Sequence, residues 1–122
     1  MILEQTDIND VILLTPRVYK DERGYFMESY NHKKVEILIK DQFVQDNESV
    51  SRKNVLRGLH FQLPPHPQAK LIRVIKGSIL DVAVDLRKGS STYGKHVKHV
   101  LSGDNKKQVY IPVGVAHGFL SL

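Results

Sequence analysis

The chain has 122 residues, of which 41% are hydrophobic and 25% charged, and it carries a formal net charge of +5 at pH 7 and no cysteine. This composition predicts one soluble globular domain over residues 1–122, because no apolar run approaches the roughly 18–20 residues that span a bilayer and the acidic, polar N-terminus is unlike a signal peptide. The absence of cysteine excludes disulfides, thiolate metal sites and a cysteine nucleophile, and is typical of the reducing cytoplasm, where we expect the protein to act.

The first third of the chain predicts two strands separated by a turn. The apolar run Val11–Leu14 predicts a short buried strand, and Asp21–Gly24 predicts a polar turn with Gly24 at a positive φ. Residues 25–30 predict a strand in which Phe26 and Glu28 share a face, because side chains alternate along a strand.

The next segment predicts the one helix of the chain. Val35, Leu38 and Ile39 follow the i, i+3, i+4 spacing of a helix over 32–40, and Asn31 is placed to cap it.

The rest of the chain predicts strands and turns only. The expected strands are residues 43–47, 49–56, 56–63, 70–76, 79–86, 97–101, 109–111 and 117–122. Residues 64–67 must be irregular because of their prolines, and Gly77-Ser78 predicts a tight hairpin between the strands on either side of it. This pattern predicts an all-β fold, an antiparallel sandwich or barrel of the jelly-roll type.

Two features of these strands bear on the site and on the assembly. Along 79–86 the apolar side chains alternate with Asp81, Ala83 and Asp85, so that the two aspartates share one face. Residues 119–122 are still apolar where the chain stops, so we expect a further strand after Leu122 or a partner chain that covers this edge.

Charge is divided unevenly along the chain. Residues 1–50 carry 6 Lys and Arg against 10 Asp and Glu, whereas residues 51–122 carry 12 against 3. Chance variation on a solvated surface would explain this division. So would a basic cleft for an anionic ligand, with the acidic half of this or another subunit packed against the basic half. The basic residues are scattered and are not interleaved with aromatics, so nucleic acid is not expected as a partner.

The stretch from Arg57 to Lys70 contains more polar side chains than the packing of apolar strands requires. His60 lies in an apolar strand whose face also carries Gly58 and Gln62, which predicts a cavity wall. An ideal strand would send Arg57 to the face opposite His60, so both can enter one site only if Gly58 bends or bulges the strand. Lys70 is either a surface lysine that extends its stem along apolar neighbours or a cation that stabilises an anion at the site.

A second histidine, His117, follows the turn at Pro112–Gly114 and could converge with His60. His96 and His99, three residues apart on one strand, point to opposite faces and do not form a metal site. No serine triad, phosphate-binding glycine loop or dinucleotide fingerprint is present.

Six segments in register give the chain a specific resemblance to the dTDP-4-dehydrorhamnose 3,5-epimerase family. They are residues 21–29, 43–47, 55–62, 70–73, 81–87 and 111–119. The resemblance implies a cupin-type jelly roll, and Pro112-x-Gly114-x-x-His117 is similar to the second cupin motif. Lys70 stands where a metal-binding cupin would carry a glutamate ligand, which argues against a metal; no cofactor is implied.

The resemblance also implies a reaction and site residues. The family epimerises dTDP-4-dehydro-6-deoxy-D-glucose at C3 and C5, a step of dTDP-rhamnose biosynthesis. It implies His60 as the base and Lys70 as the cation beside the 4-keto oxygen. The implied substrate-binding residues are Arg57 and His117 for the sugar or phosphate, Gln45 and Asn47 for the nucleotide, and Arg23, Phe26 and Glu28 from the neighbouring subunit of a homodimer that exchanges N-terminal strands.

The resemblance leaves two questions open. It implies that the tyrosine acid and the aspartate that polarises the base lie after Leu122; Asp81 or Asp85 is the candidate within the chain for a partner of His60. The same residues would also suit a 3-epimerase or a 3,4-ketoisomerase of a dTDP-4-keto-6-deoxyhexose, or a truncated protein that binds the nucleotide sugar without catalysis.

Overall fold

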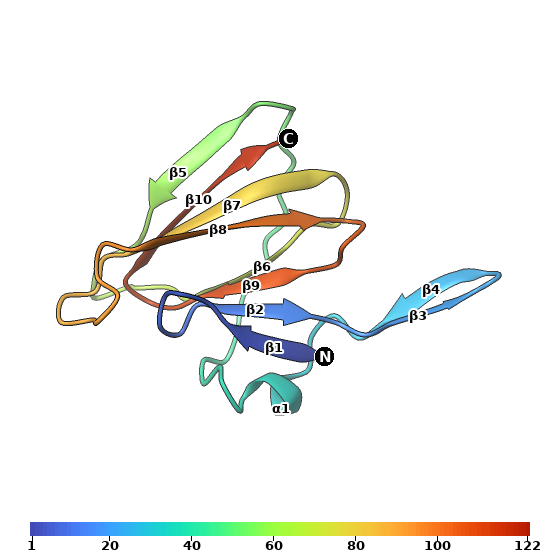
Figure 1. Ribbon diagram of the computed structural model, residues 1–122, viewed down its shortest axis with the longest axis horizontal. Helices are drawn as coiled ribbons and strands as arrows, with labels where there is room; N and C mark the ends of the chain where they lie inside the picture. The colour runs from blue at the N-terminus through green and yellow to red at the C-terminus, as the bar shows by residue number, and fades with distance from the viewer.

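The computed structural model describes residues 1–122 as two four-stranded antiparallel sheets, a projecting hairpin and one short helix (Figure 1). The first sheet has the order β1-β2-β9-β6 and the second the order β5-β10-β7-β8. The elements are β1 Ile2–Gln5, β2 Ile12–Thr15, β3 Val18–Asp21, β4 Gly24–Met27, α1 His32–Val35, β5 Leu56–His60, β6 Lys70–Arg73, β7 Ser78–Asp85, β8 His96–Ser102, β9 Gln108–Ile111 and β10 Val115–Ser121. The predicted all-β antiparallel sandwich is confirmed, and the sheets remain separate rather than closing into a barrel.

The first sheet is covered on both faces, which explains the unbroken apolar run of β2. Leu13 faces the second sheet, in a core cluster to which both sheets contribute. Ile12 and Leu14 face the other way, against Val35 of α1 and Tyr110 of β9. A strand that is buried on both faces shows no polar alternation, so the prediction of a buried strand there is confirmed.

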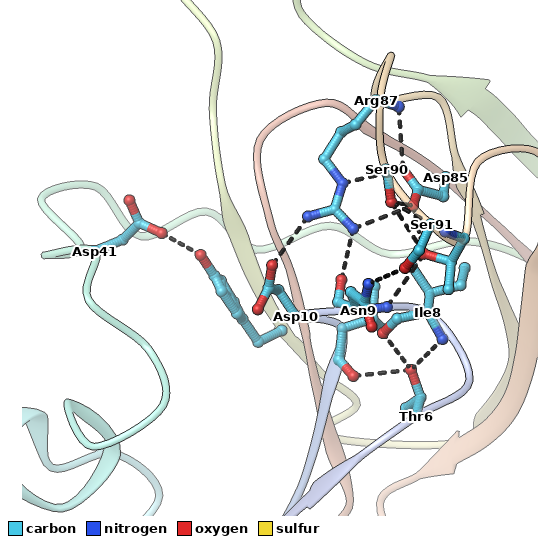
Figure 2. Close-up of polar contacts among 12 residues, drawn as sticks. Thr6, Ile8, Asn9, Asp10, Asp41, Asp85, Arg87, Ser90 and Ser91 are labelled. Carbon is cyan, nitrogen blue, oxygen red and sulfur yellow. Dashed lines mark hydrogen bonds and ion pairs between the residues drawn. The ribbon is translucent and has the colours of Figure 1, made fainter.

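Tyr110 anchors the segment that follows α1 to the outer face of the first sheet. Its phenolic hydroxyl donates a hydrogen bond to Asp41 (Figure 2). Burial raises the pKa of Tyr110, and the neighbouring carboxylate raises it further. The hydroxyl therefore stays protonated and holds this contact.

In the second sheet the aspartate face of β7 is the buried one. Asp81, Ala83 and Asp85 are all buried and face the first sheet, whereas Val82 and Val84 on the opposite face are only partly buried. The predicted alternation is confirmed, but the more polar of the two faces points inward. Polar groups buried between two sheets need partners, because an unpaired one costs about 1–3 kcal/mol.

Asp85 finds its partners in the loops at one end of the sandwich (Figure 2). Its carboxylate accepts hydrogen bonds from Thr92 Oγ1 at 2.7 Å and from Arg87 Nε at 3.0 Å. Arg87 Nη2 also donates to the carbonyl oxygen of Asn9 at 2.6 Å, and Nη1 pairs with Asp10 at 3.1 Å. Burial alone would raise the pKa of Asp85, but these hydrogen bonds hold it well below its usual range. Asp85 therefore ties the β1–β2 turn to the β7–β8 loop.

The predicted helix, two of the predicted strands and the predicted hairpin differ from the structure. The helix ends at Val35 rather than at residue 40, and Asn31 makes no cap; its amide instead donates to Glu28. The strands predicted over 43–47 and 49–56 do not form before β5 begins at Leu56, and no strand of this chain pairs with residues 43–53. Gly77-Ser78 does not close a hairpin, since β6 pairs with β9 in the first sheet whereas β7 pairs with β8 and β10 in the second.

Candidate functional site

A bulge in β5 brings Arg57 and His60 to the same face of the second sheet. His60 pairs with His117 of β10, but Arg57 pairs with Phe119, so three steps along β5 match two along β10. Gly58 absorbs the extra residue with φ +92°, and a Cβ there would lie 2.6 Å from the carbonyl oxygen of His117. The condition set on Gly58 by the sequence is therefore met.

This face points into the space between the sheets. His117 pairs with Ala83, which belongs to the core shared by the two sheets. Residues paired directly across antiparallel strands share a face, so His60, Arg57 and His117 all point the same way. Because β5 is an edge strand, His60 and Arg57 remain exposed to solvent at the rim of this space. Arg57 Nε donates to Ser51 Oγ at 3.0 Å.

His117 is held by a buried carboxylate. Its Nε2 lies 2.5 Å from Oδ2 of Asp81, and the two residues are only 6% and 1% exposed. A carboxylate oxygen accepts, so Nε2 donates the hydrogen of this bond, and a neutral ring then has Nδ1 as its acceptor nitrogen. The pair therefore fixes both the orientation and the tautomer of His117 beside His60.

The Asp81–His117 pair corrects the expected partner of His60. Neither Asp81 nor Asp85 contacts His60: the first pairs with His117 and the second with Arg87, Ser90 and Thr92. Alternation along β7 identified both aspartates as facing one way. Which histidine they meet depends on the register between β7 and β10, which no local pattern contains.

Lys70 faces the same space from the first sheet. It pairs with Ile111, a member of the shared core, and Ile72 two residues later packs on that core. Lys70 is partly buried and forms no salt bridge within the chain. Its position on the inner face brings a cation into the space that His60 and His117 line from the other sheet.

The remaining predicted site residues lie elsewhere in the chain. The β3–β4 hairpin projects away from both sheets (Figure 1), and Phe26 on it is 71% exposed. Arg23 pairs with Asp21 at 2.7 Å, and Glu28 pairs with Lys34 at 2.8 Å.

Gln45 and Asn47 occupy the segment without regular structure. They bond to each other, with Gln45 Nε2 donating to Asn47 Oδ1 at 3.1 Å. Within one chain, neither these two residues nor the three on the hairpin segment are brought to His60.

No three His, Asp or Glu side chains are grouped so that they could hold a metal ion. No helix has the length and apolar character needed to cross a membrane.

Comparisons with known proteins agree on one family. A family model described as dTDP-4-dehydrorhamnose 3,5-epimerase matches residues 5–122. The enzyme of that name from Salmonella typhimurium is 55% identical over 124 residues, which are 100% of this chain and 68% of the relative. The one from Shigella flexneri is 54% identical over 97% of this chain and 66% of its own length. The chain thus spans about two thirds of the curated relatives that it matches.

Solved structures show the same likeness. A crystal structure of dTDP-4-dehydrorhamnose 3,5-epimerase from Elizabethkingia anophelis superposes with a TM-score of 0.94 at 51% identity, over 100% of this chain and 68% of that one. These neighbours are cupin-fold epimerases, so the predicted cupin-type jelly roll is confirmed. An epimerase from Legionella pneumophila, solved in complex with dTDP-4-keto-L-rhamnose, gives a TM-score of 0.93 at 50% identity, over 99% of this chain and 65% of that one.

Proposed function

Because the chain belongs to the dTDP-4-dehydrorhamnose 3,5-epimerase family, we propose that it epimerises dTDP-4-dehydro-6-deoxy-D-glucose at C3 and C5. The proposal is supported chiefly by the residues on the inner face of the sandwich. There the β5 bulge turns His60 and Arg57 toward the same space as the Asp81–His117 pair and Lys70. This set combines a base, fixed polar groups and a cation, as removal of a proton beside a ketone requires.

In the proposed reaction His60 takes the proton from the carbon next to the 4-keto group. The electron pair of the broken C–H bond forms a double bond from that carbon to C4. The C4 carbonyl then becomes an enolate, with the negative charge on the former 4-keto oxygen. A base of this kind contributes roughly 10²–10⁴-fold to the rate. His60 makes no side-chain hydrogen bond within the chain, so its ring is free to approach the sugar.

Lys70 stabilises the enolate. Its ammonium group lacks a carboxylate partner in the chain and faces the same space from the opposite sheet. A positive charge placed at the developing oxyanion before the reaction starts contributes about 2.7–4 kcal/mol in comparable sites. His117, held in one tautomer by Asp81, offers a second fixed polar group to the sugar.

Inversion also needs an acid on the sugar face opposite His60. None of the five tyrosines lies beside His60: Tyr110 is bonded to Asp41 on the outer face of the first sheet, Tyr19 and Tyr25 lie on the projecting hairpin, Tyr30 contacts His32, and Tyr93 lies in the β7–β8 loop. We therefore place the acid outside residues 1–122.

We also propose that the working unit is a homodimer in which the β3–β4 hairpin serves the partner's site. Phe26 and Arg23 are exposed on a hairpin that projects from its own sandwich (Figure 1). Val44 and Val50, in the segment that pairs with no strand, are 94% and 86% exposed. Exposed apolar side chains on a segment without a partner strand are typical of a surface that another chain covers.

Deuterium wash-in tests the reaction. The protein is incubated with dTDP-4-keto-6-deoxyglucose in D₂O, and each sugar carbon is followed by proton NMR. Deuterium at both C3 and C5 supports the proposed 3,5-epimerase. Deuterium at C3 alone would assign the protein as a 3-epimerase or ketoisomerase, and binding of dTDP without any wash-in would assign it as a nucleotide-sugar-binding protein.

The proposed exchange of hairpins predicts an effect of Arg23 on binding. Arg23→Ala should weaken dTDP binding about 10-fold to 100-fold in calorimetry, because a hydrogen bond to a charged group contributes about 1.5–3 kcal/mol. Arg17→Ala is the matched control, since Arg17 is exposed just before β3 and stacks on Tyr19.

Mixing a variant that binds dTDP weakly with a variant that lacks the base tests whether Arg23 acts across the dimer. Arg23→Ala and His60→Ala, combined and allowed to exchange subunits, should recover about a quarter of wild-type sites, since half of the dimers are mixed and each carries one intact site. A monomer that binds dTDP with wild-type affinity would refute the arrangement.

A further inference from the structure

His99 lies beside the Asp81–His117 pair, on β8, which flanks β7 on the side away from β10. It belongs to β8, where it pairs directly with Asp81 of β7. Directly paired residues of antiparallel strands share a face, with their Cβ atoms about 4.5–5.5 Å apart. His99 is partly buried on this face, whereas His96, three residues earlier, is exposed. The carboxylate of Asp81 therefore lies between two imidazoles, one on each neighbouring strand.

The two imidazoles relate to Asp81 differently. His117 holds Oδ2 at 2.5 Å, and Oδ1 accepts no hydrogen bond within the chain. His99 makes no hydrogen bond to the carboxylate, so it acts on Asp81 through its charge. Burial lowers the pKa of His99, Asp81 raises it and Lys107 lowers it further, with a net lowering. Near neutral pH His99 is thus uncharged.

The charged and titratable groups around His99 lie in a surface groove and on the neighbouring strands. The polar groove between the edge strands β1 and β8 carries Glu4, Asp7, His96, Lys98 and His99. From the second sheet Asp81 faces His99, and from the turn before β9 Lys107 does. Through the groove His99 can exchange protons with solvent, which the buried His117 and Asp81 do only poorly.

We propose that His99 is a positioning residue that controls the hold of Asp81 on His117. While His99 is neutral, the full charge of Asp81 acts on His117 and keeps its ring oriented beside His60. When His99 takes up a proton from the groove, its positive charge competes for the carboxylate and opposes a proton on His117. The structural part of this inference stands on the chain alone; its consequence for catalysis rests on the proposed function.

Histidine NMR tests the coupling without substrate, so its outcome does not depend on the proposed reaction. The ring carbons of His117 are followed from pH 4 to 9 in the wild type, His99→Leu and His99→Lys. In the wild type the His117 ring carbons should shift when His99 takes up its proton, and His99→Leu should lose that shift because the positive charge beside Asp81 never forms. His99→Lys, which keeps a charge at all these pH values, should hold the His117 ring carbons near the shifts that they show in the wild type with His99 charged.

His96→Leu is the matched control, because it removes a histidine from the same strand and groove but from the opposite face. It should keep the His117 shift that accompanies protonation of His99. Identical His117 pH curves in the wild type and His99→Leu would overturn the proposal. So would loss of the shift in both His99→Leu and His96→Leu. If His99→Lys does not fold, the comparison of the two leucine variants is sufficient.

Discussion

His60→Ala should lower deuterium wash-in at C3 and C5 by at least about 100-fold while dTDP binding stays at the wild-type level. The imidazole is the only group on the β5 rim that can accept the proton, and a general base contributes roughly 10²–10⁴-fold. Its removal leaves Lys70 and the Asp81–His117 pair in place. Wash-in is measured by NMR and binding by calorimetry on the same samples.

His66→Ala is the matched control for this prediction. His66 is an exposed histidine in the proline loop that follows β5, so its loss should change neither wash-in nor binding. Unchanged wash-in in His60→Ala would remove His60 from the role of base, and equal losses in both variants would point to a general effect on the fold.

Gly58→Ala should destabilise the fold and abolish the site together. A Cβ at this position would lie 2.6 Å from His117 O and 2.8 Å from Gly118 Cα, and backbone atoms paired in the sheet have little freedom to move away. The positive φ of Gly58 adds about 1–2 kcal/mol for any residue with a side chain, and overpacking adds about 1–3 kcal/mol. We expect a loss of about 2–5 kcal/mol in the free energy of unfolding, measured by urea denaturation.

Gly77→Ala separates the clash from the backbone strain. Gly77 also has a positive φ, +84°, but a Cβ there meets nothing within 4 Å. Gly77→Ala should therefore show only the strain of about 1–2 kcal/mol and keep wash-in. If Gly58→Ala matched Gly77→Ala in both stability and wash-in, the bulge would not be what forms the site.

Local patterns predicted much of this fold and part of the site. The buried run of β2, the turn at Gly24 and the alternation of β7 follow from neighbouring residues alone, and the structure confirms them. The requirement that Gly58 bend β5 also came from spacing, because Arg57 and His60 are three residues apart on one strand.

What the sequence did not predict depends on contacts between distant segments. β6 pairs with β9 and not with β7, the next strand in the sequence, so the expected hairpin at Gly77 is absent. His117 meets Asp81 because of the register between β10 and β7. Residues 43–53 read as strands from their composition, but composition does not supply a partner strand. Long-range register, rather than local propensity, decides these features.

Ligand-induced shifts of the histidine resonances test the location of the site most directly. dTDP-rhamnose lacks the 4-keto group and is not turned over, so it can be titrated to saturation while all six histidines are observed. We predict that the ring resonances of His60 and His117 shift with the ligand and that those of His66 and His96 do not. Shifts at His66 or His96, with His60 and His117 unchanged, would contradict a site between the two sheets.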